Sequence, residues 1–277
     1  MFDTLILSGG HIKGISHLGA LDFLHDLHLL ENITTYVGTS IGSIICYLLI
    51  IGYSPLELML EFCKTEILNK MKIDIFNFIN RKGAFSFGPI QEFLEQLTIK
   101  KIGIFLTMSK LKELFKKSLT CVTYNYSAHK IEYLNENTFP DLPCITALRM
   151  SSNLPGLFED FLYNNKYYID GGVYEHFPIS YINTDTDKVI GITLESIPEQ
   201  SSNTQEDSIL IYFYKIINIP RQQVIKNTMS VLDFKKTFII SIPSEDVNIL
   251  TFKPSIEESY MLYKKGYEFA KTSWSSF

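Results

Sequence analysis

Apolar and polar positions in the N-terminal part of the chain follow two different periods. The continuous apolar run 5–7 ends at two glycines and indicates a buried strand. Over 15–30 apolar residues recur at helical spacing, and 34–37 is again a short β-branched and aromatic run. A mostly apolar helix is expected over 40–52. The pattern therefore predicts a β-α-β-α unit whose two strands are parallel neighbours with a right-handed crossover.

The alternation of strands and helices continues to the C-terminus. It indicates one α/β domain over residues 1–277, with a motif-bearing core at about 4–195 and with 196–277 as the C-terminal part of the same domain. Glu195–Asp207 is polar and rich in turn residues, and predicts a loop. The other predicted elements are helices at Leu56–Asn69, Pro89–Leu97, Lys110–Lys117 and Ile256–Lys271, a short helix between Pro140 and Pro155, and strands at Leu119–Tyr124, Tyr167–Ile169, Lys188–Leu194 and Phe238–Ile242.

Composition narrows the classes of function. The chain has 277 residues, of which 46% are hydrophobic and 20% charged, so it can bury a large core and is not a mainly disordered chain. The formal net charge of −5 leaves no positive surplus for phosphate backbones, and nucleic acid is not an expected partner. Because the four cysteines lie far apart, we expect buried thiols and neither a disulfide framework nor a metal site.

No segment has the pattern of a secretory signal or of a membrane-spanning helix. The N-terminus lacks a basic region, and its apolar stretch stops at Gly9. The most apolar segment, Ile41–Tyr53, is shorter than the roughly 20 residues that a spanning helix needs. We therefore expect a protein that is cytoplasmic or peripheral at membranes.

The segment Gly38-Thr39-Ser40-Ile41-Gly42 has the G-x-S-x-G pattern of a nucleophile elbow. In such an elbow the serine projects from a sharp strand-to-helix turn, and small residues flank it because the backbones crowd there. The pattern follows a predicted strand and opens a predicted helix, as this geometry requires. The context favours a nucleophilic Ser40 over a turn that serves packing alone.

A second glycine-rich turn, SGGHIKG at residues 8–14, lies between the first strand and the first helix. Backbone amides of such a loop aim at one point, and the start of a helix adds positive charge, so the loop is a natural anion site. It is not a P-loop, because no Lys-Ser/Thr follows at the required spacing. Since the first two strands are parallel, the loop and Ser40 emerge at one sheet edge, as an oxyanion hole requires.

Asp170 lies on a third glycine turn, Asp170-Gly171-Gly172, after another predicted strand. A carboxylate there approaches other backbones closely, as a base beside a serine must; an ordinary D-G turn is the alternative. A histidine base would normally follow the acid in the chain, and His176 is the only histidine after Asp170, six residues on. That spacing is cramped for a triad. His25 and His28, at i and i+3, indicate a solvated helix face rather than a metal pair.

Four motifs, in this order, resemble those of patatin-like phospholipases. LILSGGHIKGISHLGAL resembles the family's oxyanion loop and first helix, and YVGTSIGSIICYLLIIGYS its nucleophile elbow and buried helix. LRMSSNLPGLFEDF resembles the family's A-S-x-x-[IL]-P-x-x-F stretch, and YIDGGVYEHFPI its D-G-G-x-x-x-N-x-P. Two residues depart from the pattern: His11 replaces the middle glycine of the loop, and His176 replaces the asparagine.

The resemblance implies a three-layer α/β/α fold with a central, mostly parallel sheet, and a Ser-Asp dyad in place of a triad. Ser40 would be the nucleophile and Asp170 the base, with the backbone amides of Gly9, Gly10, His11 and Ile12 holding the oxyanion. The implied reaction is hydrolysis of carboxylic esters of phospholipids or related lipids through an acyl-enzyme, with no metal or cofactor. The supporting motif residues would be Lys13, Gly14, Gly38, Gly42, Gly171 and Gly172.

Two other hypotheses remain open at this point. A pseudoenzyme with a decayed site would bind lipid or a protein partner, and an α/β-hydrolase-like esterase would use His176 as its base. Lys72–Phe87 is either a lid or membrane-touching loop, or a buried strand or helix pair. Ile209–Ile219 is apolar and β-prone, and is expected in the core or in the wall of an acyl pocket. Because of the net charge of −5, transient membrane contact would depend on local apolar surface.

Overall fold

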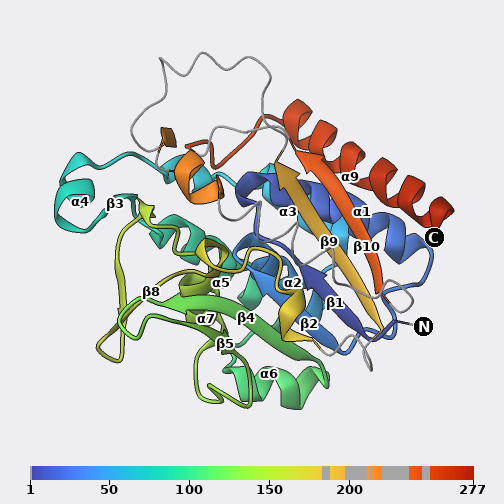
Figure 1. The fold of residues 1–277 in the computed structure, drawn as a ribbon, viewed down its shortest axis with the longest axis horizontal. Coiled ribbons are helices and arrows are strands. Elements are labelled where there is room, and N and C mark those ends of the chain that lie inside the picture. Colours follow the sequence, from blue (N-terminus) through green and yellow to red (C-terminus); the bar gives the residue numbers. More distant parts are fainter. Residues whose placement is uncertain (1, 183–187, 197–210, 213, 220–236, 245–249) are drawn as a thin grey trace.

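A mixed sheet with helices packed on it forms the body of the molecule (Figure 1). The computed structural model describes residues 2–182, 188–196, 211–212, 214–219, 237–244 and 250–277. Within these residues, eight strands form the sheet in the order β10-β9-β1-β2-β4-β8-β7, and β5 also pairs with β4. The strands are β1 (Thr4–Leu7), β2 (Thr35–Thr39), β4 (Ser118–Asn125), β5 (Lys130–Leu134), β7 (Phe161–Tyr163), β8 (Lys166–Asp170), β9 (Val189–Ser196) and β10 (Thr237–Ser244).

The helices come from every part of the described chain. They are α1 (Ile15–Asp26), α2 (Ile41–Ile50), α3 (Pro55–Lys64), α4 (Ile75–Asn80), α5 (Gly88–Ile102), α6 (Met108–Phe115), α7 (Cys144–Ser151) and α9 (Ile256–Ser276). Short 3₁₀ turns are η1 (His11–Gly14), η2 (Ile67–Lys70), η3 (Gly171–Val173) and η4 (Ile179–Tyr181), and a separate small sheet pairs β3 (Gly83–Phe85) with β6 (Gly156–Phe158).

Strand direction divides the sheet into two parts. From β10 through β9, β1 and β2 to β4, all neighbours are parallel. The pairings of β4 with β5 and with β8, and that of β8 with β7, are antiparallel. The α/β class is therefore confirmed, and β1 has a parallel neighbour on each side. The loop after β1 lies where the chain order reverses across the sheet, which is where open α/β sheets bind ligands.

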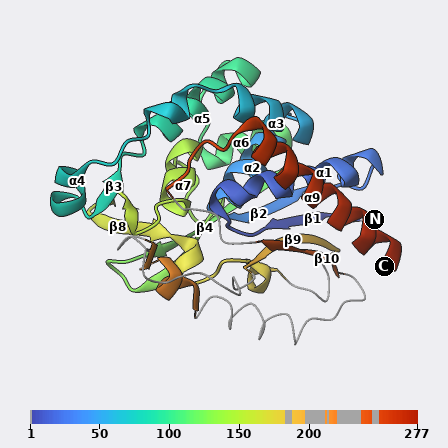
Figure 2. The same ribbon diagram turned by 90° about the horizontal axis from the view of Figure 1, so that it is seen from above.

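The two faces of the sheet pack against different parts of the chain. Leu5 and Leu7 of β1 pack into the main core with the large helices, while Ile6 packs on the other face with Phe177 and Ile179. This alternation is what a strand buried on both faces requires. Figure 2 shows α1, α2 and α9 together on one side of β1, β9 and β10.

The C-terminal helix α9 packs directly on α1 through glycines. A Cβ added at Gly19 would lie 1.8 Å from the carbonyl oxygen of Tyr263, and one added at Gly266 would lie 1.9 Å from that of Ser16. Only glycine, which has no Cβ, fits at such an approach. The N- and C-terminal ends of the described chain are thus held against each other.

Several predicted elements differ from the structure in their bounds. The helix predicted to Leu30 ends at Asp26, and the helix predicted over 56–69 is broken at Thr65, which is extended. Glu195 and Ser196, predicted as loop, belong to β9, while 197–207 lie outside the described residues. Residues 211–212 and 214–219 are helical in spite of their β-prone composition. The predicted core position is wrong for Tyr212, Ile216 and Ile219, which are exposed. The pattern missed β3, β5, β6 and β7, of which all but β5 have three residues, too few for a periodic signal.

None of the described helices is, by itself, both long and apolar enough to cross a membrane. Taken together, α2 and α3 have the length and composition, but the pair is bent by 119°.

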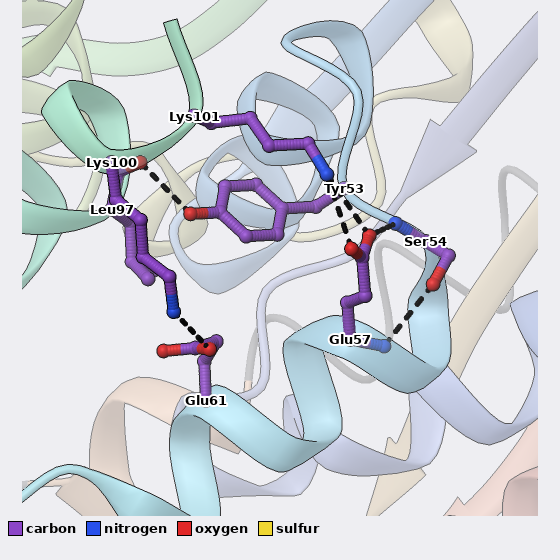
Figure 3. Close-up of polar contacts among 7 residues, drawn as sticks. All are labelled: Tyr53, Ser54, Glu57, Glu61, Leu97, Lys100 and Lys101. Atoms are coloured by element: carbon purple, nitrogen blue, oxygen red, sulfur yellow. Dashed lines mark hydrogen bonds and ion pairs between the residues drawn. The ribbon is translucent and has the colours of Figure 1, made fainter. Parts of the chain in front are cut away.

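Helices α3 and α5 are joined by a polar clasp (Figure 3). The buried Tyr53 hydroxyl donates to the carbonyl oxygen of Leu97 at 2.9 Å. Around it, Lys100 pairs with Glu61 at 2.7 Å, and Lys101 lies with its Nζ 4.6 Å from the Tyr53 ring centroid. A capping box between Ser54 and Glu57 starts α3. The clasp sets the distance between two helices that line the cavity described below.

We predict that the buried tyrosine contributes more to this clasp than its exposed ion pair. Tyr53→Phe removes a buried hydrogen bond and should lower the free energy of unfolding by about 1 kcal/mol. Lys100→Gln removes a pair whose lysine is exposed and should cost less than about 0.5 kcal/mol. Urea denaturation of both variants measures the free energy of unfolding. The assignment would be contradicted if Tyr53→Phe left this free energy unchanged, or if Lys100→Gln lowered it more than Tyr53→Phe does.

Candidate active site

Ser40 occupies a sharp turn between β2 and α2. Its backbone angles are φ 56° and ψ −125°, a conformation that L-residues rarely adopt. A Cβ added at Gly42 would lie 2.4 Å from the carbonyl oxygen of Leu7, and one added at Gly38 would lie 2.4 Å from the backbone nitrogen of Ser43. Both glycines of the motif are therefore needed for the turn to form at all.

Ser151, at the end of α7, holds the strained residue in place. The Ser40 N–H donates to Ser151 Oγ at 3.0 Å, and the Ser151 hydroxyl donates to the Val122 carbonyl oxygen at 2.6 Å. On the other side, the Ser43 hydroxyl donates to the Ser40 carbonyl oxygen at 2.6 Å. Ser151 was not predicted to have a role, although its position in the LRMSSNLP motif is the one signal that could have indicated it.

Strand register brings Ser40 and Asp170 level with each other. Thr39 of β2 is opposite Val122 of β4, so Ser40 lies level with the next residue, Thr123. β5 pairs with residues 121–125 of β4 and so overlaps the paired residues of both β2 and β8, which places it along the opposite edge of β4. β8 therefore follows β2 along one edge, where Asp170 is opposite that same Thr123. The end of β2 and the end of β8 meet at this residue, so the Ser40 turn and Asp170 are neighbours.

The turn that carries Asp170 is held tightly against β4. The carboxylate is buried, and its Oδ1 accepts from the Gly172 N–H at 2.6 Å. The Asp170 N–H donates to the Asn153 carbonyl oxygen at 2.9 Å. A Cβ added at Gly171 would lie 2.3 Å from the Val122 carbonyl oxygen, so the D-G-G turn also depends on its glycine. These contacts fix the direction of the carboxylate.

The glycine loop after β1 lies directly beside Ser40. A Cβ added at Gly9 would lie 3.6 Å from the Ser40 Cβ and 2.9 Å from His176 Nδ1. The Gly9 N–H donates to the His176 carbonyl oxygen at 2.9 Å, so this amide is already engaged. Among the residues that the structure describes, the amides of Gly10, His11 and Ile12 donate no hydrogen bond. These three are the ones open to an anion.

The rest of the loop packs closely on its neighbours. A Cβ at Gly10 would lie 2.3 Å from Leu194 Cδ1, and one at Gly14 would lie 2.4 Å from Ile41 Cγ1. Gly14 thereby brings the start of α1 against the start of α2, next to the elbow. Lys13, one of the predicted supporting motif residues, is buried.

His11 takes the backbone conformation that a glycine would have there. Its φ is 53°, so the loop keeps a left-handed turn in spite of the side chain. The ring packs edge-on against Phe252, with centroids 5.0 Å apart. Burial, assisted by the charge of Lys13, lowers the pKa of His11 to about 4. The imidazole is therefore neutral at pH 7 and adds no charge to the loop.

A second buried histidine, His17 of α1, supports the same loop. Its Nε2 lies 3.0 Å from the Ser8 carbonyl oxygen, so we assign the ring proton to Nε2. Burial lowers the pKa of His17 to about 4. The Ser8 hydroxyl in turn donates to the Gly9 carbonyl oxygen at 2.8 Å. The start of the loop is thus anchored from the helix that follows it.

The remaining histidines divide between site and surface. His176 is buried and next to Gly9, so it belongs to the group around Ser40. His25 and His28 are both exposed, but only His25 lies on α1, because the helix ends at Asp26; His28 pairs with Glu31 at 2.7 Å. Within the described residues, no group of three or more His, Cys, Asp or Glu side chains has the arrangement of a metal site.

An apolar cavity of about 110 Å³ opens at Ser40. It runs along α2 and is closed on its far side by α3 and α5, the helices joined by the clasp. Apart from Ser40 itself, its wall includes Ile41, Ile44, Phe62, Ile90, Phe93 and Leu94. Such a lining suits a hydrocarbon chain and offers almost nothing to a polar one.

Arg149 of α7 supports the aromatic part of this wall from behind. The guanidinium is buried, lies 4.3 Å from the Phe87 ring centroid, and donates to the Glu159 carbonyl oxygen at 3.0 Å. Burial lowers the pKa of Arg149 to about 10, and the side chain remains charged at pH 7. Phe87 and Phe158, which both contact the guanidinium, also line the cavity.

Sequence comparison identifies relatives over most of the chain. The model of the family described as patatin-like phospholipase matches residues 5–182. The probable lipid hydrolase 463L of Invertebrate iridescent virus 6 is 36% identical over 182 residues, which are 64% of this chain and 62% of that protein. The chain thus matches less than two thirds of that relative's length. The uncharacterized protein R571 of Acanthamoeba polyphaga mimivirus is 26% identical over 278 residues, which are 97% of this chain and 92% of that protein.

Two solved bacterial structures share the fold. VipD from Legionella pneumophila superposes with a TM-score of 0.61 at 16% identity, over 99% of this chain and 67% of VipD. ExoU from the type III secretion system of Pseudomonas aeruginosa, in its complex with SpcU, gives a TM-score of 0.57 at 15% identity, over 99% of this chain and 52% of that chain. At these identities the likeness concerns the fold alone.

We predict that Ser151 stabilises the elbow and that its neighbour does not. Ser151→Ala leaves the Ser40 N–H and the Val122 carbonyl oxygen without this partner, and should lower the free energy of unfolding by about 1–3 kcal/mol. Ser152→Ala is the matched control, because the buried Ser152 hydroxyl has no hydrogen-bond partner among the described residues. Thermal or urea unfolding compares them. Equal losses in the two variants would contradict the bridging role.

We also predict an acid-dependent loss of stability that involves His17. The unfolded chain protonates this ring near pH 6.5, whereas the folded pKa is about 4. Stability is therefore full above about pH 6.5 and is lost as the pH falls toward 4, by about 2 kcal/mol at pH 5 for this group. Urea denaturation gives the free energy of unfolding at pH 7 and at pH 5. In His17→Gln the difference between these two free energies should be smaller than in the wild type by about 2 kcal/mol. His25→Gln, on the exposed end of α1, should leave it unchanged; equal slopes in all three proteins would refute the prediction.

Proposed function

The chain belongs to the patatin-like phospholipase family, and from this premise we propose that it is a serine lipid acyl hydrolase that cleaves carboxylic ester bonds of phospholipids through a Ser40–Asp170 dyad. The observation that carries the proposal is the strand register: β2 and β8 follow each other along one edge of β4, so that Ser40, the residue after Thr39, and Asp170 meet at Thr123. The glycine loop and an apolar cavity meet at the same serine.

In the first half of the reaction, Asp170 takes the proton of the Ser40 hydroxyl as the oxygen attacks the ester carbonyl carbon. The tetrahedral oxyanion accepts hydrogen bonds from the amides of Gly10, His11 and Ile12, which have no other acceptor among the described residues. Asp170 then gives the proton to the leaving alcohol, and the acyl group stays on Ser40. In the second half, Asp170 takes a proton from the water that attacks the acyl carbonyl carbon. It returns this proton to Ser40 Oγ as the bond between Oγ and the acyl group breaks and the fatty acid is released.

The cavity supports a substrate with an aliphatic acyl chain. It begins at Ser40 and follows Ile41 and Ile44 of α2, so a chain attached to the serine enters it directly. The neutral His11 ring at its rim keeps this part of the site uncharged at pH 7. We propose that the ester carbonyl sits at the loop, the acyl chain in the cavity, and the polar headgroup toward solvent.

We further propose that residues 1–277 form a single catalytic domain. Two contacts support this: β10 extends the sheet beside β9, and α9 packs through Gly266 on α1. Both link the chain beyond residue 196 to the part that carries the motifs. Lipid is the proposed substrate, and nucleic acid is not a proposed partner.

The test is hydrolysis of p-nitrophenyl butyrate and of phosphatidylcholine vesicles, with fluorophosphonate labelling. Ser40→Ala should abolish all three, and Asp170→Asn should lower kcat by about 10²–10⁴-fold, the range of a lost general base. Asp141→Asn, an exposed carboxylate, should retain the wild-type rate. His176→Asn, which restores the family's residue, should stay active.

Two results would favour the other hypotheses. A wild-type protein that hydrolyses neither ester and takes no probe, yet binds lipid, is a pseudoenzyme. Loss of activity in His176→Ala combined with substantial activity in Asp170→Asn would identify a histidine-dependent esterase. The second outcome needs to be tested because His176 Nδ1 lies close to Gly9, and Gly9 lies next to Ser40.

A further inference from the structure

A short segment beside the cavity exposes an unusual amount of apolar surface. We call residues 72–82, which contain α4, the apolar arm. Ile73 is 56% exposed, and Phe76 and Ile79 are each 72% exposed. Single exposed apolar residues are common, but three large ones on one short segment mark a site of interaction. Figure 1 shows α4 at the margin of the molecule, projecting away from the sheet.

The inner side of the arm is firmly attached. Phe78, and Met71 just before the arm, pack on the aromatic cluster that includes Phe85 and Phe158. The Asp74 N–H donates to the Ala84 carbonyl oxygen at 2.8 Å. The arm therefore has apolar side chains on two sides, one buried in the protein and one facing outward. Its exposed side chains are not a consequence of loose packing.

The cluster under the arm is also the rim of the cavity. Phe87, Phe158 and Phe252 belong to the cluster and line the cavity that opens at Ser40. Leu68, in η2 just before the arm, lines it as well. A surface that covers the outer side of the arm would therefore lie next to the path by which an acyl chain reaches Ser40.

A second segment on the same cluster has the same construction. In the helical residues 211–219, residue 213 aside, Ile211 and Tyr214 pack on the cluster. Tyr212, Ile216 and Ile219 are exposed. Two short segments thus each anchor one side on the cavity rim and present apolar side chains outward.

The charged residues at the two ends of the arm indicate what kind of surface covers it. Lys72 begins it, and Arg81 and Lys82 end it. Arg81 pairs with Glu159 at 2.8 Å and Lys82 with Asp160 at 3.5 Å, but both cationic side chains remain more than half exposed. Lysine is depleted at protein–protein interfaces, and one short helix falls well below the roughly 1,000 Å² that a stable interface buries. Apolar tips flanked by long cationic side chains instead match the boundary between acyl chains and phosphates, where lysine and arginine reach the phosphate level.

We propose that the apolar arm inserts Ile73, Phe76 and Ile79 into the surface of a phospholipid bilayer and so brings the cavity mouth to the lipid. The inference rests on the proposed lipid hydrolase function. Because the chain carries a net charge of −5, apolar insertion drives binding, and zwitterionic phosphatidylcholine suffices as the surface.

The experiment is sedimentation with phosphatidylcholine vesicles, using the Ser40→Ala protein so that the lipid stays intact. Phe76→Ser with Ile79→Ser in that background should weaken vesicle binding by at least about tenfold, because two large apolar side chains no longer leave water. The matched control is Ile104→Ser with Phe105→Ser, which are 51% and 57% exposed between α5 and α6, away from the arm. The control should bind as its parent does, and circular dichroism should give the same fold for both.

Three results would overturn the proposal. The Ser40→Ala protein fails to bind phosphatidylcholine vesicles, the arm variant binds as tightly as its parent, or the arm variant changes an oligomer into a monomer in analytical ultracentrifugation. None of these readouts needs catalysis. If the wild-type protein proves inactive toward esters, the proposed function fails while vesicle binding still decides the role of the arm.

Discussion

The geometry of the candidate site depends on how two strands share one edge of β4. Parallel β2 occupies the first part of this edge and antiparallel β8 the rest, while β5 pairs along the opposite edge, and the ends of β2 and β8 meet at Thr123. A shift of either strand by one residue would move Ser40 and Asp170 out of line and reverse which side chains face the core. The register is held from several directions: the Ser151 hydroxyl bonds to Val122, and Gly171 packs on the same carbonyl oxygen. The site is thus a property of the sheet and not of flexible loops.

The same constraint explains why the strained turn at Ser40 is stable. A left-handed backbone at a non-glycine residue is costly, by about 1–3 kcal/mol, and persists only where the surroundings determine it. Here the following helix α2 is almost wholly buried, and the turn is joined to α7 by the bond to Ser151. The apolar residues of α2 have two roles, because Ile44 belongs to the main core and also lines the cavity. Core packing and substrate binding therefore draw on one helix.

Much of this arrangement could be predicted from the sequence, and the reasons for the exceptions are physical. The N-terminal β-α-β-α unit could be predicted because continuous apolar runs and helical spacing are local signals. As its parallel strands require, this unit brings Gly9 beside Ser40. Asp170 could be singled out only by its glycine turn, and its register with Ser40 depends on pairings across 130 residues that no local pattern contains. Ser151 and Arg149 were missed because their roles arise from contacts with β4 and with aromatic rings distant in sequence. The helical form of 211–212 and 214–219 was missed because the β-prone composition is overridden by packing on the aromatic cluster.

The central claim is that one serine, one glycine loop and one apolar cavity form a single acyl-transfer site. The most direct measurement is a crystal structure of the protein after reaction with a long-chain alkyl fluorophosphonate. The account predicts a bond to Ser40 Oγ, a phosphonyl oxygen 2.7–3.1 Å from at least two of the amides of Gly10, His11 and Ile12, the distance expected for an oxyanion hole, and the alkyl chain along Ile41 and Ile44. A phosphonyl oxygen directed into solvent, or an alkyl chain outside the cavity, would contradict it.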